Sequence, residues 1–281
     1  KYAHLPVIMK IDEVTGNKRK LSKRKDNEAA VSYFIKDGYP AEALIMYLMT
    51  IANTNFEEWI LNNKFDGMEN FLFSFNNMSL DGALFDTGKL NFFAREIIGK
   101  MTREEVIARA SGYAKVFKPE LYELISRNPD YFGDIMYIEK DKENPRKDYE
   151  KFGDLIERIG FFYEEHYDEI LNNQLPFNEK VTKEDIIEIL EALKEGLSLK
   201  QDEQSWFANM KEIAVKHGYA GNRGEYKANP ESFKGLVGDV AEILRITLTG
   251  RKNSPNLYYV MRILDKKECD KRIDKVISLL K

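Results

Sequence analysis

Residues 38–53 read GYPAEALIMYLMTIAN, and this stretch indicates how most of the chain is built. Gly38 is expected to end the short helix that precedes it. Pro40 suits the first position of a helix, because the N–H that proline lacks has no partner there in any case. Residues 41–53 are then apolar on most faces, which predicts a helix buried in a core. We therefore expect this part of the protein to consist of packed helices.

Helical patterns continue after residue 26. Thr102-Arg103-Glu104-Glu105 is a capping box, which satisfies free N–H groups where a helix begins. Other helices are expected at residues 28–36, 56–61, 86–99, 148–165, 182–196, 203–217, 232–248, 254–264 and 266–279. Only residues 2–11 suggest a strand, and no partner strand precedes it. The prediction is a mainly α protein with a short β remnant in front.

Composition excludes several classes of protein. The 281 residues include one cysteine and three widely spaced histidines, which rules out a disulfide framework and argues against a metal site within this chain. No apolar run approaches the roughly 18 residues that span a bilayer, and the first residues given do not have the pattern of a signal peptide, so we expect a cytoplasmic protein without membrane contact. The net charge of −4 still permits a local basic patch.

The sharpest feature is Lys18-Arg19-Lys20-Leu21-Ser22-Lys23-Arg24-Lys25, in which six of eight residues are cationic. It is expected to form a loop between a strand and a helix. Ammonium groups, a hydroxyl and nearby helix N–H groups together suit a polyphosphate. Two lysines placed against a leaving pyrophosphate would stabilise the charge that develops in the transition state. The alternative is a solvated charge run or a patch like a nuclear-localisation signal.

Within this octamer, Lys20-Leu21-Ser22-Lys23-Arg24 resembles the KMSKS signature of class I aminoacyl-tRNA synthetases, in the KLSKR form typical of glutamyl-tRNA synthetases. Other segments resemble that family in the same order: His4-Leu5-Pro6, and residues 26–34, 38–48, 85–91, 248–257 and 263–267. The family's HIGH-type sequence is absent, because no two histidines are three residues apart. The resemblance therefore implies the C-terminal half or more of a synthetase, lacking the glutamate pocket and most of the ATP pocket.

The resemblance assigns roles within the loop. It implies that Lys23 contacts the phosphates of ATP, with Lys20 beside it as the second catalytic lysine and Ser22 supporting the loop. Leu21 takes the place of the signature's methionine, and Arg24 that of its last serine, as is usual in the glutamyl branch. The cofactor implied is ATP with Mg²⁺. The chain alone is expected not to form glutamyl-adenylate.

The resemblance also divides the chain. Residues 1–26 would end the catalytic domain, 27–100 would form a helical stem-contact domain, and 101–281 an all-helical anticodon-binding domain of the bacterial type. The partner implied is tRNA(Glu), with tRNA(Gln) left open, while glutamate and ATP bind through the missing N-terminal domain. We expect a monomer.

Contacts with tRNA are expected near the C-terminus. Residues 250–281 hold nine Lys/Arg against four Asp/Glu, which offers a phosphate-facing surface. Arg251, Lys252 and Arg262 are the candidate tRNA-binding residues there. The alternative is an ordinary solvated helix rich in lysine. Tyr131 or Tyr219 is a candidate for stacking on anticodon bases.

Two other functions stay open at this stage. One is a non-catalytic tRNA- or RNA-binding helical module related to the synthetase. The other is a helical scaffold that carries a basic loop and has no role with RNA.

Overall fold

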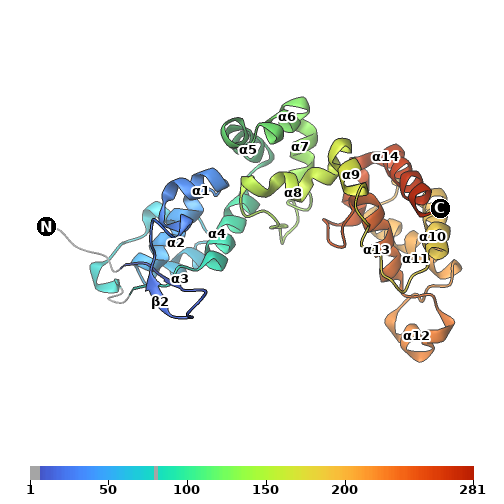
Figure 1. The fold of residues 1–281 in the computed structure, drawn as a ribbon, viewed down its shortest axis with the longest axis horizontal. Coiled ribbons are helices and arrows are strands. Elements are labelled where there is room, and N and C mark those ends of the chain that lie inside the picture. Colours follow the sequence, from blue (N-terminus) through green and yellow to red (C-terminus); the bar gives the residue numbers. More distant parts are fainter. Residues whose placement is uncertain (1–6, 79–81) are drawn as a thin grey trace. The chain divides into compact units, whose positions relative to one another are not determined.

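A computed structural model describes residues 7–78 and 82–281, so His4-Leu5-Pro6 and the start of the expected strand lie outside the described residues. The chain forms two compact units, Lys1–Glu157 and Arg158–Lys281. Helices dominate both, as the sequence predicts (Figure 1). No helix among the described residues is long and apolar enough to cross a membrane. The expected functional divisions after residues 26 and 100 stay predictions.

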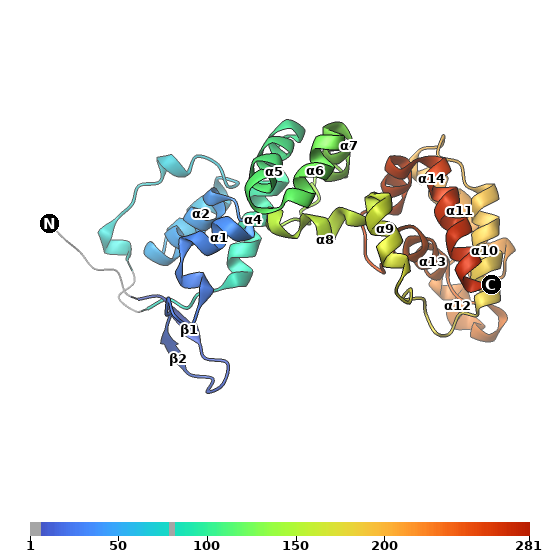
Figure 2. The same ribbon diagram turned by 45° about the horizontal axis from the view of Figure 1, so that its top comes forward.

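The first unit begins with a β-hairpin (Figure 2). Strand β1 (Met9–Ile11) pairs antiparallel with β2 (Lys18–Lys20), and Met9 lies opposite Lys20. On its other edge Met9 bonds to Ala83 and Phe85, at 2.8 and 2.7 Å. Both partners of β1 follow it in the chain, so the expectation that only residues 2–11 form a strand is wrong, because residues 18–20 pair with β1.

The remaining elements of this unit are helical. They are the 3₁₀ helix η1 (Asn27–Ala29), α1 (Val31–Asp37), α2 (Ala41–Ala52), α3 (Phe56–Asn62), the 3₁₀ helices η2 (Met68–Asn70) and η3 (Phe75–Asn77), α4 (Thr87–Lys100), α5 (Arg103–Phe117), α6 (Pro119–Arg127), α7 (Pro129–Met136) and the 3₁₀ helix η4 (Phe152–Asp154). Helix α8 (Leu155–Ile159) spans the division between the units.

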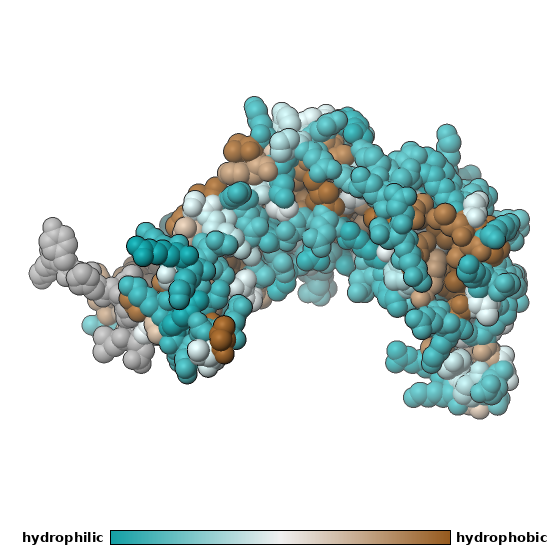
Figure 3. Space-filling model, in the orientation of Figure 1, coloured by the Kyte–Doolittle hydropathy of each residue, from teal (hydrophilic) through white to brown (hydrophobic). Residues whose placement is uncertain are grey.

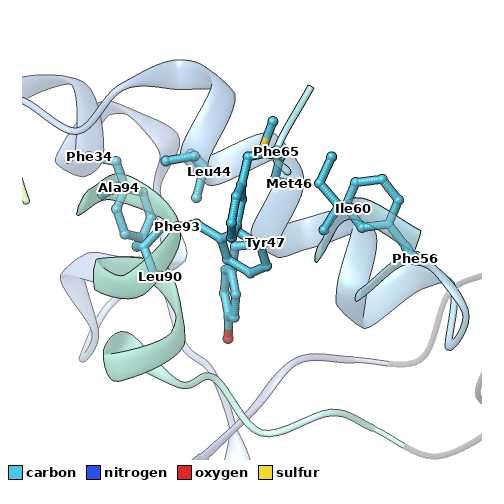
Figure 4. Packing of buried hydrophobic residues seen from close by; sticks show 11 residues of the cluster. Phe34, Leu44, Met46, Tyr47, Phe56, Ile60, Phe65, Leu90, Phe93 and Ala94 are labelled. Atoms are coloured by element: carbon cyan, nitrogen blue, oxygen red, sulfur yellow. The ribbon is translucent and has the colours of Figure 1, made fainter. Parts of the chain in front are cut away.

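The core of this region forms between α2 and α4 (Figure 4). Tyr47 of α2 and Phe93 of α4 are both fully buried, as the apolar pattern of residues 41–53 predicts. The Asp86 N–H donates to the Tyr47 hydroxyl at 2.7 Å. The Asp86 carboxylate in turn accepts from the Lys89 N–H at 3.0 Å and caps α4. One aspartate therefore joins the helix start to the core.

A close approach of two backbones joins α1 to η4. The Phe152 N–H donates to the Gly38 carbonyl at 2.9 Å, and a Cβ on Gly153 would lie 2.3 Å from the Asp37 carbonyl oxygen. The Tyr113 hydroxyl of α5 donates to the Lys36 carbonyl at 2.7 Å. This contact explains why the single helix expected at 148–165 is wrong: the chain turns at η4 to meet α1, and then breaks again.

The second unit is built from helices alone apart from one isolated bridge, within the residues that the structure describes. They are the 3₁₀ helix η5 (Gly160–Phe162), α9 (Glu164–Leu171), α10 (Lys183–Gly196), α11 (Glu203–Lys216), α12 (Arg223–Ala228), the 3₁₀ helix η6 (Pro230–Ser232), α13 (Val237–Thr249) and α14 (Leu257–Leu280). Helix α12 was not anticipated from the sequence.

Buried Arg272 of α14 holds this unit together. Its Nη1 donates to the carbonyls of Phe161 and Leu248, at 2.7 Å each, and its guanidinium lies 4.0 Å from the centre of the Tyr167 ring. Helix α14 is broken at Asp265, where φ is 64° and ψ is 168°, so the two helices expected on either side of this residue are present. The first begins after Asn256 and not at Ser254.

We predict that Gly153→Ala destabilises the first unit by about 1–3 kcal/mol, because the new methyl group meets a backbone carbonyl that cannot rotate away. Gly112→Ala is the matched control: it lies within α5 and a Cβ there has nothing within 4 Å. That change should stabilise the unit by about 0.5–1 kcal/mol. Urea unfolding followed by circular dichroism measures both, and equal effects of the two variants would contradict the close approach.

Candidate functional site

A tight turn follows β2 and carries the KLSKR sequence. The N–H groups of Lys25 and Asp26 both donate to the Ser22 carbonyl, at 3.0 and 2.8 Å. The expected loop over residues 18–25 is therefore shorter than predicted, since residues 18–20 form β2. Hydrophilic side chains cover much of the surface over the hairpin (Figure 3).

The buried carboxylate of Asp26 anchors this turn. Arg19 donates to it through Nη1 at 2.6 Å and Nη2 at 2.8 Å, and the Ser22 N–H donates at 2.8 Å. Lys10 Nζ lies 3.7 Å away. The Arg19 guanidinium, then the Ser22 N–H, hold the pKa of Asp26 well below its usual range. The carboxylate thus stays ionised and ties the start of the turn to its end.

Arg19 forms ion pairs with acidic residues of this chain, whereas the lysines of the turn form none with described residues. Arg19 Nε also donates to Asp12 at 2.9 Å. Lys20, Lys23 and Arg24 are exposed, and within residues 7–78 and 82–281 no carboxylate pairs with them. The side chains of these three residues are therefore exposed to solvent, and no described carboxylate neutralises their charge.

These cations line a cavity of about 690 Å³. Lys20, Ser22, Lys23 and Arg24 form its polar wall, and Val7, Ile8, Leu21 and Ala29 form its apolar wall. Lys25 is not part of the lining. Three positive groups and a hydroxyl beside an apolar surface can hold phosphate groups attached to a larger organic part.

Among the described residues, no group of three or more His, Cys, Asp or Glu side chains could hold a metal ion. Asp26, which lies at the turn itself, already accepts from Arg19 and Ser22. The contact of this loop with the phosphates of ATP, and the place of Mg²⁺, stay predictions.

The three candidate residues near the C-terminus have separate surroundings. Arg251 lies over the Phe161 ring at 5.8 Å, and Arg262 over the Tyr258 ring at 5.7 Å. Lys252 is exposed, with Glu242 at 3.8 Å. Their role with tRNA stays a prediction.

The excess of positive charge in residues 250–281 is largely offset by acids outside this segment. Lys275 Nζ lies 2.6 Å from Asp168 of α9, and Lys271 pairs with Glu164 of the same helix. A count of charged residues within 250–281 omits these acidic partners, because they belong to another part of the sequence. Of the two tyrosines proposed to stack on bases, Tyr219 is only 1% exposed, which excludes it, and Tyr131 is half-buried.

Sequence reasoning missed the role of Asp26. The available signal was an acidic residue directly after six cations, at a position four residues beyond Ser22. The structure shows that, of the six cations at residues 18–25, Asp26 pairs with Arg19 and not with the other five.

We predict that Asp26→Asn loosens the turn, because a neutral amide cannot replace three charge-assisted bonds. Trypsin should then cleave after Lys23 and Arg24 several-fold faster than in the wild type. Glu28→Gln, which affects only the neighbouring contact with Lys10, serves as the control.

The pH dependence of the same variant follows from the lowered pKa of Asp26. The folded-state pKa lies below the unfolded value, so the stabilisation is present above the unfolded pKa and is lost as pH falls toward the folded one. The difference in unfolding free energy between wild type and Asp26→Asn should stay constant at neutral pH and shrink below about pH 4. A difference independent of pH would contradict the anchoring role.

Comparisons with known proteins identify relatives of this chain. A family model described as "Anticodon binding domain" matches residues 227–277. Glutamate--tRNA ligase from Clostridium perfringens (strain SM101 / Type A) is 39% identical over 279 residues, which are 99% of this chain and 50% of that protein. The ligase from Clostridium beijerinckii is 38% identical, with the same two coverages.

A solved structure shows the same fold. The crystal structure of glutamate-tRNA synthetase from Elizabethkingia anophelis matches 98% of this chain and 50% of its own, with a TM-score of 0.60 and 19% identity. The chain spans about half the length of the curated relatives it matches. By its similarity over nearly the whole chain, it belongs to the glutamate–tRNA ligase family and corresponds to the C-terminal part of its members.

Proposed function

We propose that the protein containing this chain activates glutamate with ATP and transfers it to tRNA(Glu), in the cytoplasm and as a monomer. This chain would supply the loop that contacts the triphosphate and the helices that hold the tRNA. The observation that carries the proposal is the set of unpaired cations, Lys20, Lys23 and Arg24, around one cavity at a turn whose shape is set by Asp26.

The chemistry of activation explains why those cations matter. A glutamate carboxylate oxygen attacks the α-phosphorus of ATP, the bond to the β-phosphate oxygen breaks, and pyrophosphate leaves. Negative charge grows on the leaving group as that bond breaks. The ammonium groups of Lys20 and Lys23 stabilise this charge more strongly than they stabilise bound ATP, which accelerates the step. The Ser22 hydroxyl can donate to the same phosphates.

The helical remainder supports a role with tRNA. Residues 227–277 match an anticodon-binding domain, and the relatives are named for a reaction with tRNA. Mg²⁺ would enter with ATP and take its ligands from outside the residues described here. Binding assays with tRNA(Glu) and tRNA(Gln) side by side test which acceptor is used.

We predict that Lys23→Ala in the full-length protein slows glutamate-dependent ATP–pyrophosphate exchange by about 10²–10³-fold, with little change in glutamate affinity. Lys25→Ala is the matched control, because this neighbouring lysine is exposed but does not line the cavity. Equal losses in exchange and in glutamate affinity would remove the proposed role of the loop.

The 281-residue chain alone should show no exchange and should still bind tRNA. The logarithm of its affinity should fall linearly with the logarithm of the salt concentration. Clear glutamate-dependent exchange by this chain alone contradicts the proposal. Binding of tRNA by a full-length protein that shows no exchange would favour a non-catalytic RNA-binding module.

A further inference from the structure

The segment that connects α7 to η4, all of which the structure describes, forms no helix or strand. We call residues 138–150 of this segment the strap, because they contact α4 at several points. Lys147 Nζ donates to both carboxylate oxygens of Glu96, at 2.8 and 2.7 Å, and Arg95 Nη1 donates to Glu150 at 2.6 Å. The strap thus ties the bundle of α5, α6 and α7 to the C-terminal half of α4.

A buried lysine lies within the strap. Lys140 is only 8% exposed, and its Nζ donates to the Ile98 carbonyl in the last turn of α4, at 2.5 Å. Among residues 7–78 and 82–281, no carboxylate lies within ion-pair distance of this Nζ. An ammonium group has three N–H donors, so protonated Lys140 leaves its charge and two of its donors without a partner among these residues. Burying such a group is costly.

The charged groups on the neighbouring elements do not offset this cost. Each carboxylate there that is not fully exposed has its own cation: Glu96 with Lys147, Glu150 with Arg95, Glu139 with Lys142 and Arg146, Asp148 with Arg146, and Asp134 with Arg103. Asp141 and Glu143 of the strap are exposed and form no ion pair with Lys140. Lys100, which ends α4, pairs with Asp66.

The cost of the charge makes the strap sensitive to pH. Burial lowers the pKa of Lys140 from the usual 10.5 to about 8. The folded-state pKa lies below the unfolded value, so the closed strap binds a proton less readily than an open one. Closure therefore becomes more favourable as pH rises from about 7 toward 10. Throughout this range a neutral amine can still donate an N–H to the Ile98 carbonyl.

We propose that Lys140 is a pH-sensitive latch between α4 and the α5–α7 bundle: its neutral amine keeps the strap closed, and its ammonium favours an open strap. An open strap leaves the bundle attached to the first helices through Tyr113, which donates to the Lys36 carbonyl, and through Arg109, which pairs with Glu42. The end of α4 is then released. This joint lies where the expected stem-contact and anticodon-binding domains meet, and the inference does not depend on the proposed function.

Hydrogen–deuterium exchange of the strap amides tests the latch. The Arg146 N–H donates to the Glu139 carbonyl within the strap, so it is protected while the strap is closed. Lys140→Gln keeps an N–H donor and carries no charge. Comparing the two proteins at each pH, with quenched-flow labelling, cancels the pH dependence of the exchange chemistry itself. The ratio of the wild-type rate to the variant rate should fall roughly tenfold between pH 7 and pH 9. A ratio that is independent of pH, or that rises, overturns the proposal.

Lys100→Gln is the matched control. Lys100 also belongs to the joint and also donates to a backbone carbonyl, that of Lys64. It is exposed and pairs with Asp66 at 2.7 Å, so its charge has a partner. The ratio of wild-type to Lys100→Gln exchange in the strap should stay constant between pH 7 and pH 9. A fall equal to that of Lys140→Gln would show that any lysine of the joint produces the effect, and would overturn the role of Lys140.

The wild-type protein provides a second test that needs no variant. Carbon-13 NMR of the lysine side chains, followed at Cε, reports when each amine loses its proton. One resonance should titrate near pH 8, and it should be missing from the spectrum of Lys140→Gln. If no lysine of the wild type titrates below pH 9, the latch is overturned, whether or not the variants fold.

Discussion

The ion pair between Arg19 and buried Asp26 determines both the shape and the charge of the loop. Burying a carboxylate is costly unless its oxygens are fully hydrogen-bonded, and here Arg19 and the Ser22 N–H provide those bonds. The same bonds bring the first and last residues of the turn together. Asp26 pairs with Arg19 and Lys10 and with neither Lys20 nor Lys23, so these two lysines remain unpaired among the described residues beside the cavity. One buried acid thus separates the cation that builds the turn from those that can bind a ligand.

Helix starts could be predicted because their information is local. Thr102 and Glu105 satisfy each other's backbone groups within four residues, and the Thr182 hydroxyl caps α10 by accepting from the Asp185 N–H. Strand β2 was missed for the opposite reason. A run of cations resembles a solvated loop, and its extended form depends on pairing with β1 and on the bond from Arg19 to Asp26. The helix expected at 148–165 failed similarly, since Gly153 must approach a carbonyl more than a hundred residues away.

The charge of a surface is also hard to predict from the sequence when its ion-pair partners lie far away along the chain. The KLSKR cations could be identified from the sequence because the motif is continuous. The surplus of lysine in α14 could not be interpreted correctly, since Asp168 and Glu164, which neutralise Lys275 and Lys271, belong to α9.

Arginine and lysine side chains have different structural roles in this protein. Arg19 bridges Asp12 and Asp26, and Arg272 joins a carbonyl of η5 to one in the last turn of α13. Both tasks need several donors in a fixed plane, which a guanidinium has and an ammonium lacks. Lys20 and Lys23, which line the cavity at the turn, instead each carry one ammonium group on a flexible stem. A lysine in place of Arg19 would therefore keep the charge of the motif and lose the geometry that exposes the rest of it.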